Sequence, residues 1–330
     1  MLKNFILFVY ILIGLEVASQ PEYLSPEQLV FNPVKNEIYI LQKTARRIDV
    51  FNPASKNIIA SIQLQDQPNG MFINPNHEQL IVSCGEGTGK VVFIGLDSYR
   101  IDKQIRTGHS LYSPVILPEK TIAVCDRFAA KIRFIDLKEG RELKSVNVAR
   151  EPIAAVFDNQ RKMLVVAHHL PDDAATDSVV SSEITFITVP ECTVSEQISL
   201  PNGSGSVKEI QLSPCNRYAV VSHILARFTV HTAQLEQGWQ NTNAISLIDL
   251  EKQEVYHTVL LDDVQHGAAN PWAVDFMGDG KKLLVTHTGT GELSIISFPD
   301  LLNKLNEYQT HEGHFYDYSD PANKLSFLYG

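Results

Sequence analysis

Apolar and polar positions alternate along the chain in short runs that recur at a fixed interval. Six of these runs, IYILQ, LIVSC, IAVCD, LVVAH, AVVSH and LLVTH, each end in a polar or small residue. The end positions are Gln42, Cys84, Asp126 and His168, spaced 42 residues apart, followed at longer intervals by His223 and His287. Alternation with a period of two residues predicts β-strands. We call these six positions the register residues.

Two further marks repeat with the same spacing. Sixteen residues before each register residue another apolar run begins, at Pro26, Pro68, Ser110, Pro152, Val207 and Pro271. A third alternating run follows each register residue, and turn sequences such as NPVKN and MGDGKK join the first two runs. Repeats of about 40–45 residues with several strands each are typical of a β-propeller. We therefore predict an all-β protein, a β-propeller of four-stranded blades with six repeat units visible.

The last unit is incomplete in the sequence. Its third strand is predicted at Leu293–Phe298, but the following residues show no strand alternation and predict a short helix and an irregular tail. Propellers close by joining the first and last blades, because an open edge leaves backbone groups unpaired. We expect either an irregular closure or a chain that is part of a longer protein, with seven blades in the second case. The predicted domains are a signal peptide over 1–19, a propeller over 20–300 and a tail over 301–330.

The amino terminus has the pattern of a secretory signal peptide. Lys3 precedes an apolar stretch over residues 5–15, and Val17, Ala18 and Ser19 supply small residues before Gln20. The apolar stretch is shorter than the roughly 20 residues that cross a bilayer. We predict a secreted or periplasmic protein with no membrane segment after cleavage. The net charge of −10 disfavours a nucleic-acid partner, because an acidic surface repels phosphates.

Antiparallel strand order assigns each loop to one face of the propeller. Loops that follow the second strand of a unit, and links between units, share one face, which we call the upper face. Two upper-face loops are long, over residues 169–183 and 224–244, and long loops on a rigid scaffold usually carry binding. We predict that this face binds a protein partner or a small ligand. Candidate binding residues are His109, Arg150, His169, Trp239, Asp262, Asp263 and His266.

The register residues should circle the upper mouth of the central channel. Imidazole, thiolate and carboxylate groups bind zinc or copper, so Cys84, Asp126, His168, His223 and His287 form a candidate metal site. Calcium is a further candidate for the acidic first insertion. The alternative is that these polar side chains satisfy backbone groups at strand ends and hold no metal. Both interpretations stay open from the sequence.

Four cysteines occur in a chain predicted to be exported. Cys192 and Cys215 fall in lower-face loops of neighbouring units, which makes a disulfide between them geometrically reasonable. Cys84 and Cys125 should point in opposite directions and remain buried thiols. No CxxCH motif is present, so no covalent haem is expected in this chain, and no GxSxG or comparable motif marks a catalytic nucleophile.

The repeat form resembles the YVTN-type propeller repeat of exported proteins. Its elements are a proline opening, an apolar strand, a turn, a VV-x-H segment and an IDL-like strand, clearest in residues 151–198 and 270–298. The stretch from His223 to Trp239, followed by NTNAISLIDL and LLDDVQHGAANPWAV, resembles propellers joined to a C-terminal c-type cytochrome region. The resemblance covers residues 26–300. It implies that the propeller is a partner domain and that a cytochrome c domain is its partner.

Three functions remain open at this point. The first is a non-catalytic exported propeller that binds a partner or ligand through its upper face, as an accessory to a c-type cytochrome. The second is a copper or zinc redox protein that uses the histidine cluster. The third is a lactonase-like hydrolase, which needs a carboxylate or histidine pair of perturbed pKa in a closed pocket.

Overall fold

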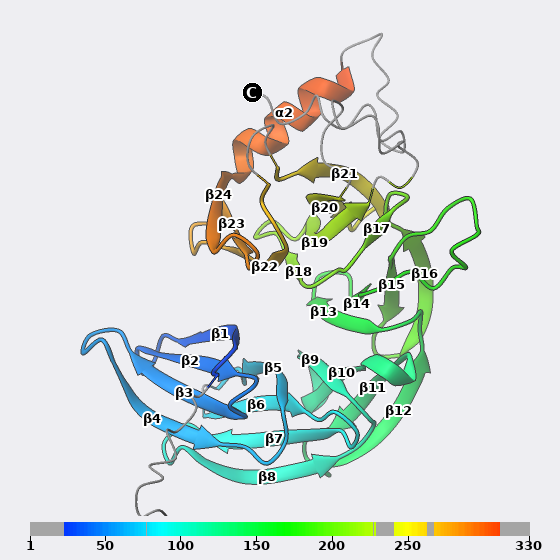
Figure 1. The fold of residues 1–330 in the computed structure, drawn as a ribbon. Helices are drawn as coiled ribbons and strands as arrows, with labels where there is room; N and C mark the ends of the chain where they lie inside the picture. The colour runs from blue at the N-terminus through cyan, green and yellow to red at the C-terminus, as the bar shows by residue number, and fades with distance from the viewer. Residues whose placement is uncertain (1–22, 77, 227, 229–240, 263–266, 311–330) are drawn as a thin grey trace, which may run out of the picture.

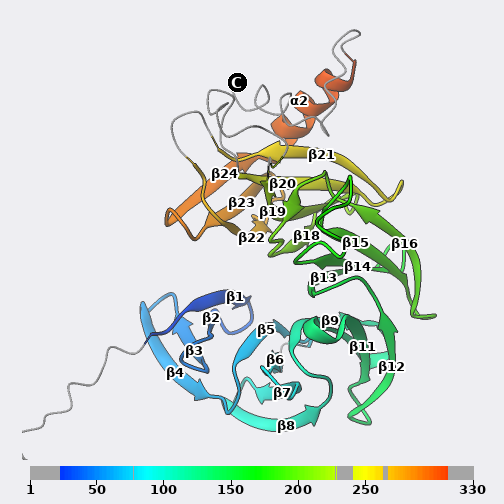
Figure 2. The same cartoon turned by 45° about the vertical axis from the view of Figure 1, so that its right-hand side comes forward.

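Each predicted unit folds into one antiparallel sheet, and the sheets are arranged as blades around a common axis (Figures 1 and 2). A computed structural model describes residues 23–76, 78–226, 228, 241–262 and 267–310 of the 330-residue chain. The prediction of an all-β propeller with six blades is confirmed. No helix in these described ranges is long and apolar enough to span a bilayer.

The first four blades contain four strands each, in sequence order from the hub outwards. Blade 1 comprises β1 (Pro26–Asn32), β2 (Glu37–Gln42), β3 (Arg47–Asn52) and β4 (Asn57–Gln63). Blade 2 comprises β5 (Pro68–Ile73), β6 (Gln79–Cys84), β7 (Lys90–Gly95) and β8 (Arg100–Arg106). Blade 3 comprises β9 (Leu111–Leu117), β10 (Thr121–Asp126), β11 (Lys131–Asp136) and β12 (Arg141–Asn147). Blade 4 comprises β13 (Pro152–Asp158), β14 (Met163–His168), β15 (Glu183–Thr188) and β16 (Thr193–Ser199).

The last two blades depart from this plan. In blade 5 the innermost strand is split into β17 (Ser204–Gly205) and β18 (Ile210–Leu212), which both pair with β19 (Tyr218–Ala226); β20 (Asn241–Asp249) and β21 (Glu254–Leu260) follow. Blade 6 has three strands, β22 (Pro271–Phe276), β23 (Lys282–His287) and β24 (Glu292–Ser297). Helix α2 (Phe298–Thr310) comes directly after β24, where the sequence lacks strand alternation. In chain order, blade 6 therefore has a helix where the other blades have a fourth strand.

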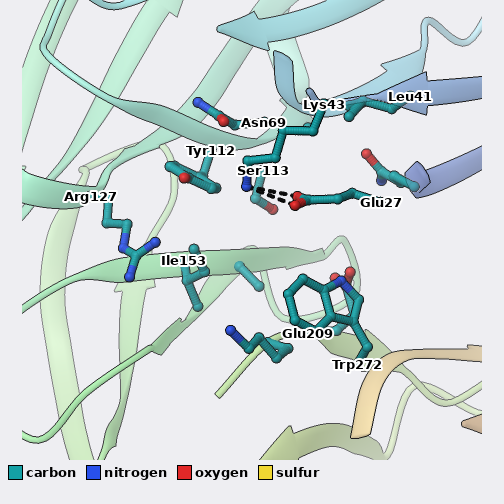
Figure 3. A pocket seen from close by; sticks show the side chains of 14 residues that line it. Glu27, Leu41, Lys43, Asn69, Tyr112, Ser113, Arg127, Ile153, Glu209 and Trp272 are labelled. Atoms are coloured by element: carbon teal, nitrogen blue, oxygen red, sulfur yellow. Dashed lines mark hydrogen bonds and ion pairs between the residues drawn. The ribbon is translucent and has the colours of Figure 1, made fainter. Parts of the chain in front are cut away.

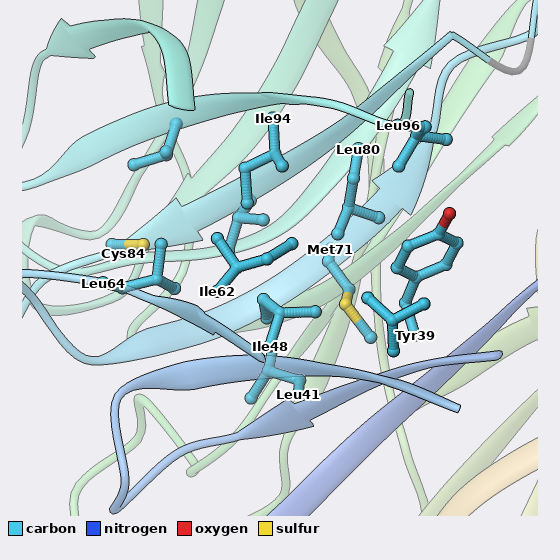
Figure 4. Packing of buried hydrophobic residues seen from close by; sticks show 13 residues of the cluster. Tyr39, Leu41, Ile48, Ile62, Leu64, Met71, Leu80, Cys84, Ile94 and Leu96 are labelled. Atoms are coloured by element: carbon cyan, nitrogen blue, oxygen red, sulfur yellow. The ribbon is translucent and has the colours of Figure 1, made fainter. Parts of the chain in front are cut away.

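Alternation within each strand places one set of side chains on each face of a blade, and both sets pack against neighbours. Between blades 1 and 2, for example, Tyr39 and Leu41 meet Leu80 and Val82 in one cluster that also contains Met71 (Figure 4). Separate clusters of the same kind fill the next four interfaces, up to blades 5 and 6. The second strands of blades 2–5 therefore read as continuously apolar at their centres, because neither face meets water. The outermost strands β4, β8, β12 and β16 are largely exposed.

The innermost strands carry a bulge that matters for function. In blades 1, 2, 4 and 6 the pairing with the second strand shifts register immediately after the opening proline. A bulged residue is left out of the ladder and its side chain is redirected. The redirected residues are Glu27, Asn69, Ile153 and Trp272, and all four line the cavity at the hub.

Asparagine and aspartate residues at strand ends close the turns between strands. The Asn32 side-chain oxygen accepts the backbone N–H groups of Val34 and Lys35 at 3.0 and 3.3 Å. Asp158 and Asp249 make the same pair of bonds two and three residues onward. Side chains of this type stabilise tight turns by copying a backbone acceptor, which explains how short lower-face links fix the strand register.

The packing between blades predicts a large difference between two leucines. Leu247 on β20 is fully buried between blades 5 and 6, whereas Leu143 on β12 is 46% exposed. We expect Leu247→Ala to lower the free energy of unfolding by about 2–5 kcal/mol, because it removes buried methyl groups and leaves a cavity. The matched Leu143→Ala variant should lose less than about 1 kcal/mol. Urea unfolding followed by circular dichroism measures both, and equal losses would contradict the packing.

Candidate functional site at the upper mouth of the hub

The register residues occupy equivalent places around the hub, but each is bound inside its own blade. The Nε2 atoms of His168, His223 and His287 lie 2.8 Å from the hydroxyl groups of Thr185, Ser246 and Ser294, respectively. Gln42 donates to Asp49 at 3.1 Å, and Asp126 accepts from Arg133 at 2.7 Å. In every case the partner lies on the next strand, two residues beyond the position opposite the register residue, and therefore diagonal to it on the same face.

Three register residues also contact the segment that links the preceding blade to their own blade. His168 Nδ1 lies 3.2 Å from the Arg150 carbonyl oxygen, and His287 Nδ1 lies 2.9 Å from that of Ala268. The Asp126 carboxylate accepts the backbone N–H of Ser110 at 3.1 Å. One side chain thus joins the entering link to the second and third strands. We call this arrangement the blade clamp.

Blade 2 shows what happens when both partners of the clamp are apolar. Cys84 stands at the register position and Val92 at the partner position, and both belong to one buried apolar cluster. Replacing both members of a buried hydrogen-bonded pair by apolar groups is nearly neutral, whereas removing one leaves a buried polar group without its partner. The repeat therefore tolerates a Cys–Val pair or a His–hydroxyl pair at the same place.

The clamp explains the charge states of these groups. Burial lowers the pKa of His168 to about 4, so the ring is neutral at physiological pH. Burial likewise raises the pKa of the Cys84 thiol to about 12. Across the described ranges, no three His, Cys, Asp or Glu side chains are grouped closely enough to hold a metal ion. The five candidate metal ligands thus share a register but not a site, because each side chain is directed along its own blade.

The predicted upper-face residues have different environments. His109 is exposed and meets Phe128 edge-on, with ring centroids 6.2 Å apart. Arg150 is exposed, whereas His169 is partly buried with Nδ1 2.7 Å from the Val207 carbonyl oxygen. Asp262 is buried and accepts the backbone N–H groups of Asn243 and Ala268, both at 2.6 Å, so it stabilises a loop. Trp239, Asp263 and His266 lie outside the described residues.

The predicted disulfide is not formed in this structure, and all four cysteines are free thiols. Cys192 packs on the interface between blades 3 and 4, and its thiol lies 3.2 Å from the Pro190 carbonyl oxygen. Cys215 lies in the β18–β19 turn of blade 5, 3.3 Å from the Ser213 hydroxyl group. The neighbour of that turn is instead Arg161, which donates to the Asn216 carbonyl oxygen at 2.7 Å. Cys192 thus packs at a blade interface, whereas Cys215 is exposed in its own turn.

The inner strands of all six blades surround a small cavity at the hub, of about 100 Å³ (Figure 3). Its lining is unusually rich in charge for the centre of a protein. It contains Glu27, Lys43, Arg127, Lys208 and Glu209, together with the rings of Tyr112 and Trp272. This mixture of cations, carboxylates and aromatic rings is the strongest candidate for a binding site in the described part of the chain.

Two of the three cations are neutralised by carboxylates. Lys43 Nζ lies 2.9 Å from Glu27, and Arg127 Nη2 lies 2.7 Å from Glu151. The same two cations flank the Tyr112 ring, with Lys43 Nζ 5.6 Å and Arg127 Cζ 5.5 Å from its centroid. These contacts hold the cations at the hub and fix the direction of the tyrosine ring.

Lys208 differs from the other two cations. Its amine lies 4.3 Å from the centroid of the Trp272 ring, and no carboxylate of the described residues lies within ion-pair distance. Burial lowers the pKa of this amine, and the positive charge of Arg127 lowers it further. Both effects disfavour the charged form, so an anion brought close to Lys208 would relieve them.

Glu209, the next residue, supplies a carboxyl group without a cation of its own. The pKa of Glu209 is raised to about 7, mainly by burial. The backbone N–H of Ile210 opposes this shift, and the charge of Asp275 adds to it. The side chain therefore exchanges its proton near physiological pH. A group with this property in a cavity is a candidate for binding or for proton transfer.

Two further cavities connect the hub to the upper face. A cavity of about 160 Å³ shares Lys208 and Trp272 with the hub cavity. It shares Ser206, Ile224 and Asn270 with a third cavity of about 450 Å³, which lies beside the start of the second long insertion. Lys208 and Trp272 therefore stand at the junction between the upper mouth and the hub.

Most hub residues escaped the sequence analysis, although a signal was present. Lys43 and Arg127 each come directly after a register residue, at the same place in their repeat units. Lys208 and Trp272 each come directly after the start of an inner strand. The site thus lies one residue beyond the positions that the repeat makes conspicuous.

Comparison with known proteins supports the fold. No protein-family model matches the chain. It is similar to Antigen Lp49 of Leptospira interrogans, serogroup Icterohaemorrhagiae serovar copenhageni, at 23% identity over 208 residues, covering 60% of this chain and 45% of that protein. The chain therefore spans less than half the length of this curated relative. Hydrazine synthase of Kuenenia stuttgartiensis has a similar structure, with a TM-score of 0.80, 17% identity, and coverage of 94% of this chain and 86% of that one.

The blade clamp predicts strong coupling between His168 and Thr185. We expect His168→Cys and Thr185→Val each to destabilise the protein by about 1–3 kcal/mol, since each leaves a buried partner unsatisfied. The double variant reproduces the Cys84–Val92 pair of blade 2 and should cost less than the sum of the two. A double-mutant cycle by urea unfolding measures the coupling; additive losses would show that the bond contributes nothing.

The same histidine should shape acid stability. Folding lowers the pKa of His168 from its ordinary value of 6.5 to about 4. Between pH 4 and pH 6.5 this histidine is therefore protonated in the unfolded chain but neutral in the folded protein. Unfolding free energy should therefore decrease as the pH falls from 6.5 to 4, by roughly 3 kcal/mol from this group. The variant with both His168→Cys and Thr185→Val should lose this part of the pH dependence, which urea unfolding at pH 4 and pH 6.5 measures.

Proposed function

We propose that this protein is a non-catalytic propeller that binds a small anionic ligand at the upper mouth of its hub. The observation that supports the proposal is the position of Lys208, which has no ion-pair partner among the described residues and lines both the hub cavity and the cavity next to it. The whole chain carries a net charge of −10, so a lone cation in a concave site is a specific feature. A cation in such a site attracts anions more strongly than one at an open surface.

The surroundings of Lys208 define the ligand class further. The Trp272 ring lies beside the amine, and the Tyr112 ring lies across the hub cavity (Figure 3). Aromatic rings bind flat or apolar groups, while the amine binds a carboxylate or phosphate. The favoured ligand therefore combines one anionic group with a flat or apolar part. The long loops over 169–183 and 224–244 are proposed to border the entrance.

Export and partnership complete the proposal. The signal-peptide pattern over residues 1–19 supports a secreted or periplasmic location. The resemblance of residues 223–239 and the segment after them to cytochrome-linked propellers supports an accessory role beside a c-type cytochrome. Propellers of different function share this architecture, so the fold alone names no partner.

A second candidate function, a hydrolase, is favoured by one observation. Glu209 is a carboxyl group with a pKa of about 7 that lines a cavity next to Lys208, which suits a general acid or base. Hydrolysis of lactone substrates that disappears in Glu209→Gln would establish this function. If the wild type shows no turnover and Glu209→Gln still binds the ligand, the binding function is favoured.

Substitution of Lys208 tests the anion site. We expect the wild type to bind benzoate, a flat carboxylate, and Lys208→Met to bind it roughly 10- to 100-fold more weakly, because one charge-assisted hydrogen bond is lost. Lys252→Met, at an exposed lower-face turn of the same blade, serves as the matched control and should bind normally. Isothermal titration calorimetry with benzoate, inorganic phosphate and an acidic peptide compares the ligand classes. Equal affinity of the two variants for every probe would rule out the proposed site.

Glu209 predicts how binding changes with pH. Below a pH of about 7 its carboxyl group is neutral and the cavity favours an anion; above this value the carboxylate repels one. Affinity for benzoate should therefore fall about tenfold between pH 6 and pH 8. Lys43 and Arg127 are ion-paired with Glu27 and Glu151, so we expect Glu209→Gln to remove the dependence. A titration at both pH values measures it, and an unchanged slope in Glu209→Gln would assign the effect elsewhere.

A further inference from the structure

Five blades bury the side chains that face the following blade, and the sixth leaves them exposed. On the third strand of blades 1–5 two residues face the next blade, and their exposed fractions lie between 0 and 4%. These pairs are Ile48 and Val50, Val91 and Phe93, Ile132 and Phe134, Ile184 and Phe186, and Ile245 and Leu247. The equivalent residues of blade 6, Leu293 and Ile295, are 50% and 58% exposed.

The opposite face of blade 1 is open in the same way. Leu29 and Phe31 on β1 are 64% and 53% exposed, whereas the residue equivalent to Leu29 in blade 2, Met71, is 2% exposed. Ile38 and Ile40 on β2 are only partly buried, although the corresponding side chains of the other blades are buried. Blades 6 and 1 form the two ends of the ring in both views, with no labelled strand between them (Figures 1 and 2). Two apolar sheet faces are thus left without a neighbour in the described part of the chain.

The sequence repeat continues beyond the described residues. Forty-two residues after His287 stands Tyr329, which ends the run LSFLY, and 42 residues after Pro271 stands Gly313. The turn segment SDPANK precedes this run, just as NPVKNE precedes the run IYILQ that ends in Gln42. The spacing of the first units therefore recurs once more, with the same order of inner run, turn and second run.

We propose that residues 313–329 form the first two strands of a seventh blade that packs between blade 6 and blade 1. In this register Leu325 and Phe327 correspond to Leu80 and Val82, which face the preceding blade. They cover Leu293 and Ile295. Leu328 corresponds to Leu41, which faces the following blade, and it covers Ile38 and Ile40. Residues 313–329 therefore supply apolar side chains to both faces, as the neighbouring blades do at the five interfaces that the structure shows.

The connection from helix α2 sets the reach of this segment. Helix α2 ends at Thr310, and three Cα-to-Cα steps lead from there to Gly313. Extended chain spans about 10 Å over this number of residues. The docking therefore requires the polypeptide to turn from the helix axis directly after Thr310.

Thiol labelling tests the proposal directly. The probe is Ile295→Cys, made in a chain whose two accessible native thiols, Cys192 and Cys215, are changed to serine. We expect a thiol reagent to label Cys at position 295 at least tenfold more slowly in the full chain than in a chain truncated after Thr310. Equal rates in the two chains would overturn the proposal. Slow labelling that appears only at high protein concentration would assign the cover to a second copy and overturn it as well.

Two substitutions keep the test independent of the truncation. Phe327→Asp in the full chain puts a charge at the proposed contact and should restore fast labelling at position 295. Ala322→Asp, in the predicted turn five residues earlier, serves as the control and should leave labelling slow. If both substitutions act alike, residues 313–329 do not pack in this register. Neither substitution touches the residues proposed to bind the anion, so the outcome is separate from that proposal.

Discussion

The blade clamp is the interaction on which the rest of the structure depends. A propeller must hold the second strand of every blade to the link that arrives from the preceding blade, and this junction is buried. One side chain at the end of the second strand makes that connection, by bonding the link on one side and the third strand on the other. Buried polar groups at such a junction need partners, since each one left without a partner costs about 1–3 kcal/mol.

Chemically different residues perform this task in different blades. His168 and His287 use neutral imidazole rings, Asp126 uses a charge pair with Arg133, and Cys84 uses apolar packing instead. In three blades the hydrogen-bonded chain continues to the fourth strand. The pairs are Asp49 with Ser61, Arg133 with Glu142, and Ser246 with Thr258. The hydrogen bonds inside the blades therefore account for the histidines of this ring.

The bulge after the opening proline gives the hub its chemical character. A regular strand would direct every inner side chain toward a neighbouring blade, where only apolar groups fit. In four blades the bulge releases a residue from that requirement, and Glu27, Asn69, Ile153 and Trp272 line the cavity instead. The hub can therefore hold charges while the blades on all sides remain tightly packed.

The local pattern alone determined the strands and their order. In blade 5 it misplaced the ends, since β19 continues to Ala226 and β20 begins at Asn241, both inside the predicted insertion. Alternation and turn residues act over a few positions, so the register at Gln42, Cys84, Asp126 and His168 could be recognised without any structure. The direction of each side chain was decided by tertiary structure. The bulge after Pro271 and the break between β17 and β18 place Trp272 and Lys208 at one cavity. The diagonal pairing directs His168 and His287 into their own blades. Cys192 packs between two blades while Cys215 is exposed in a turn, because blade packing, rather than spacing along the chain, decides which residues meet.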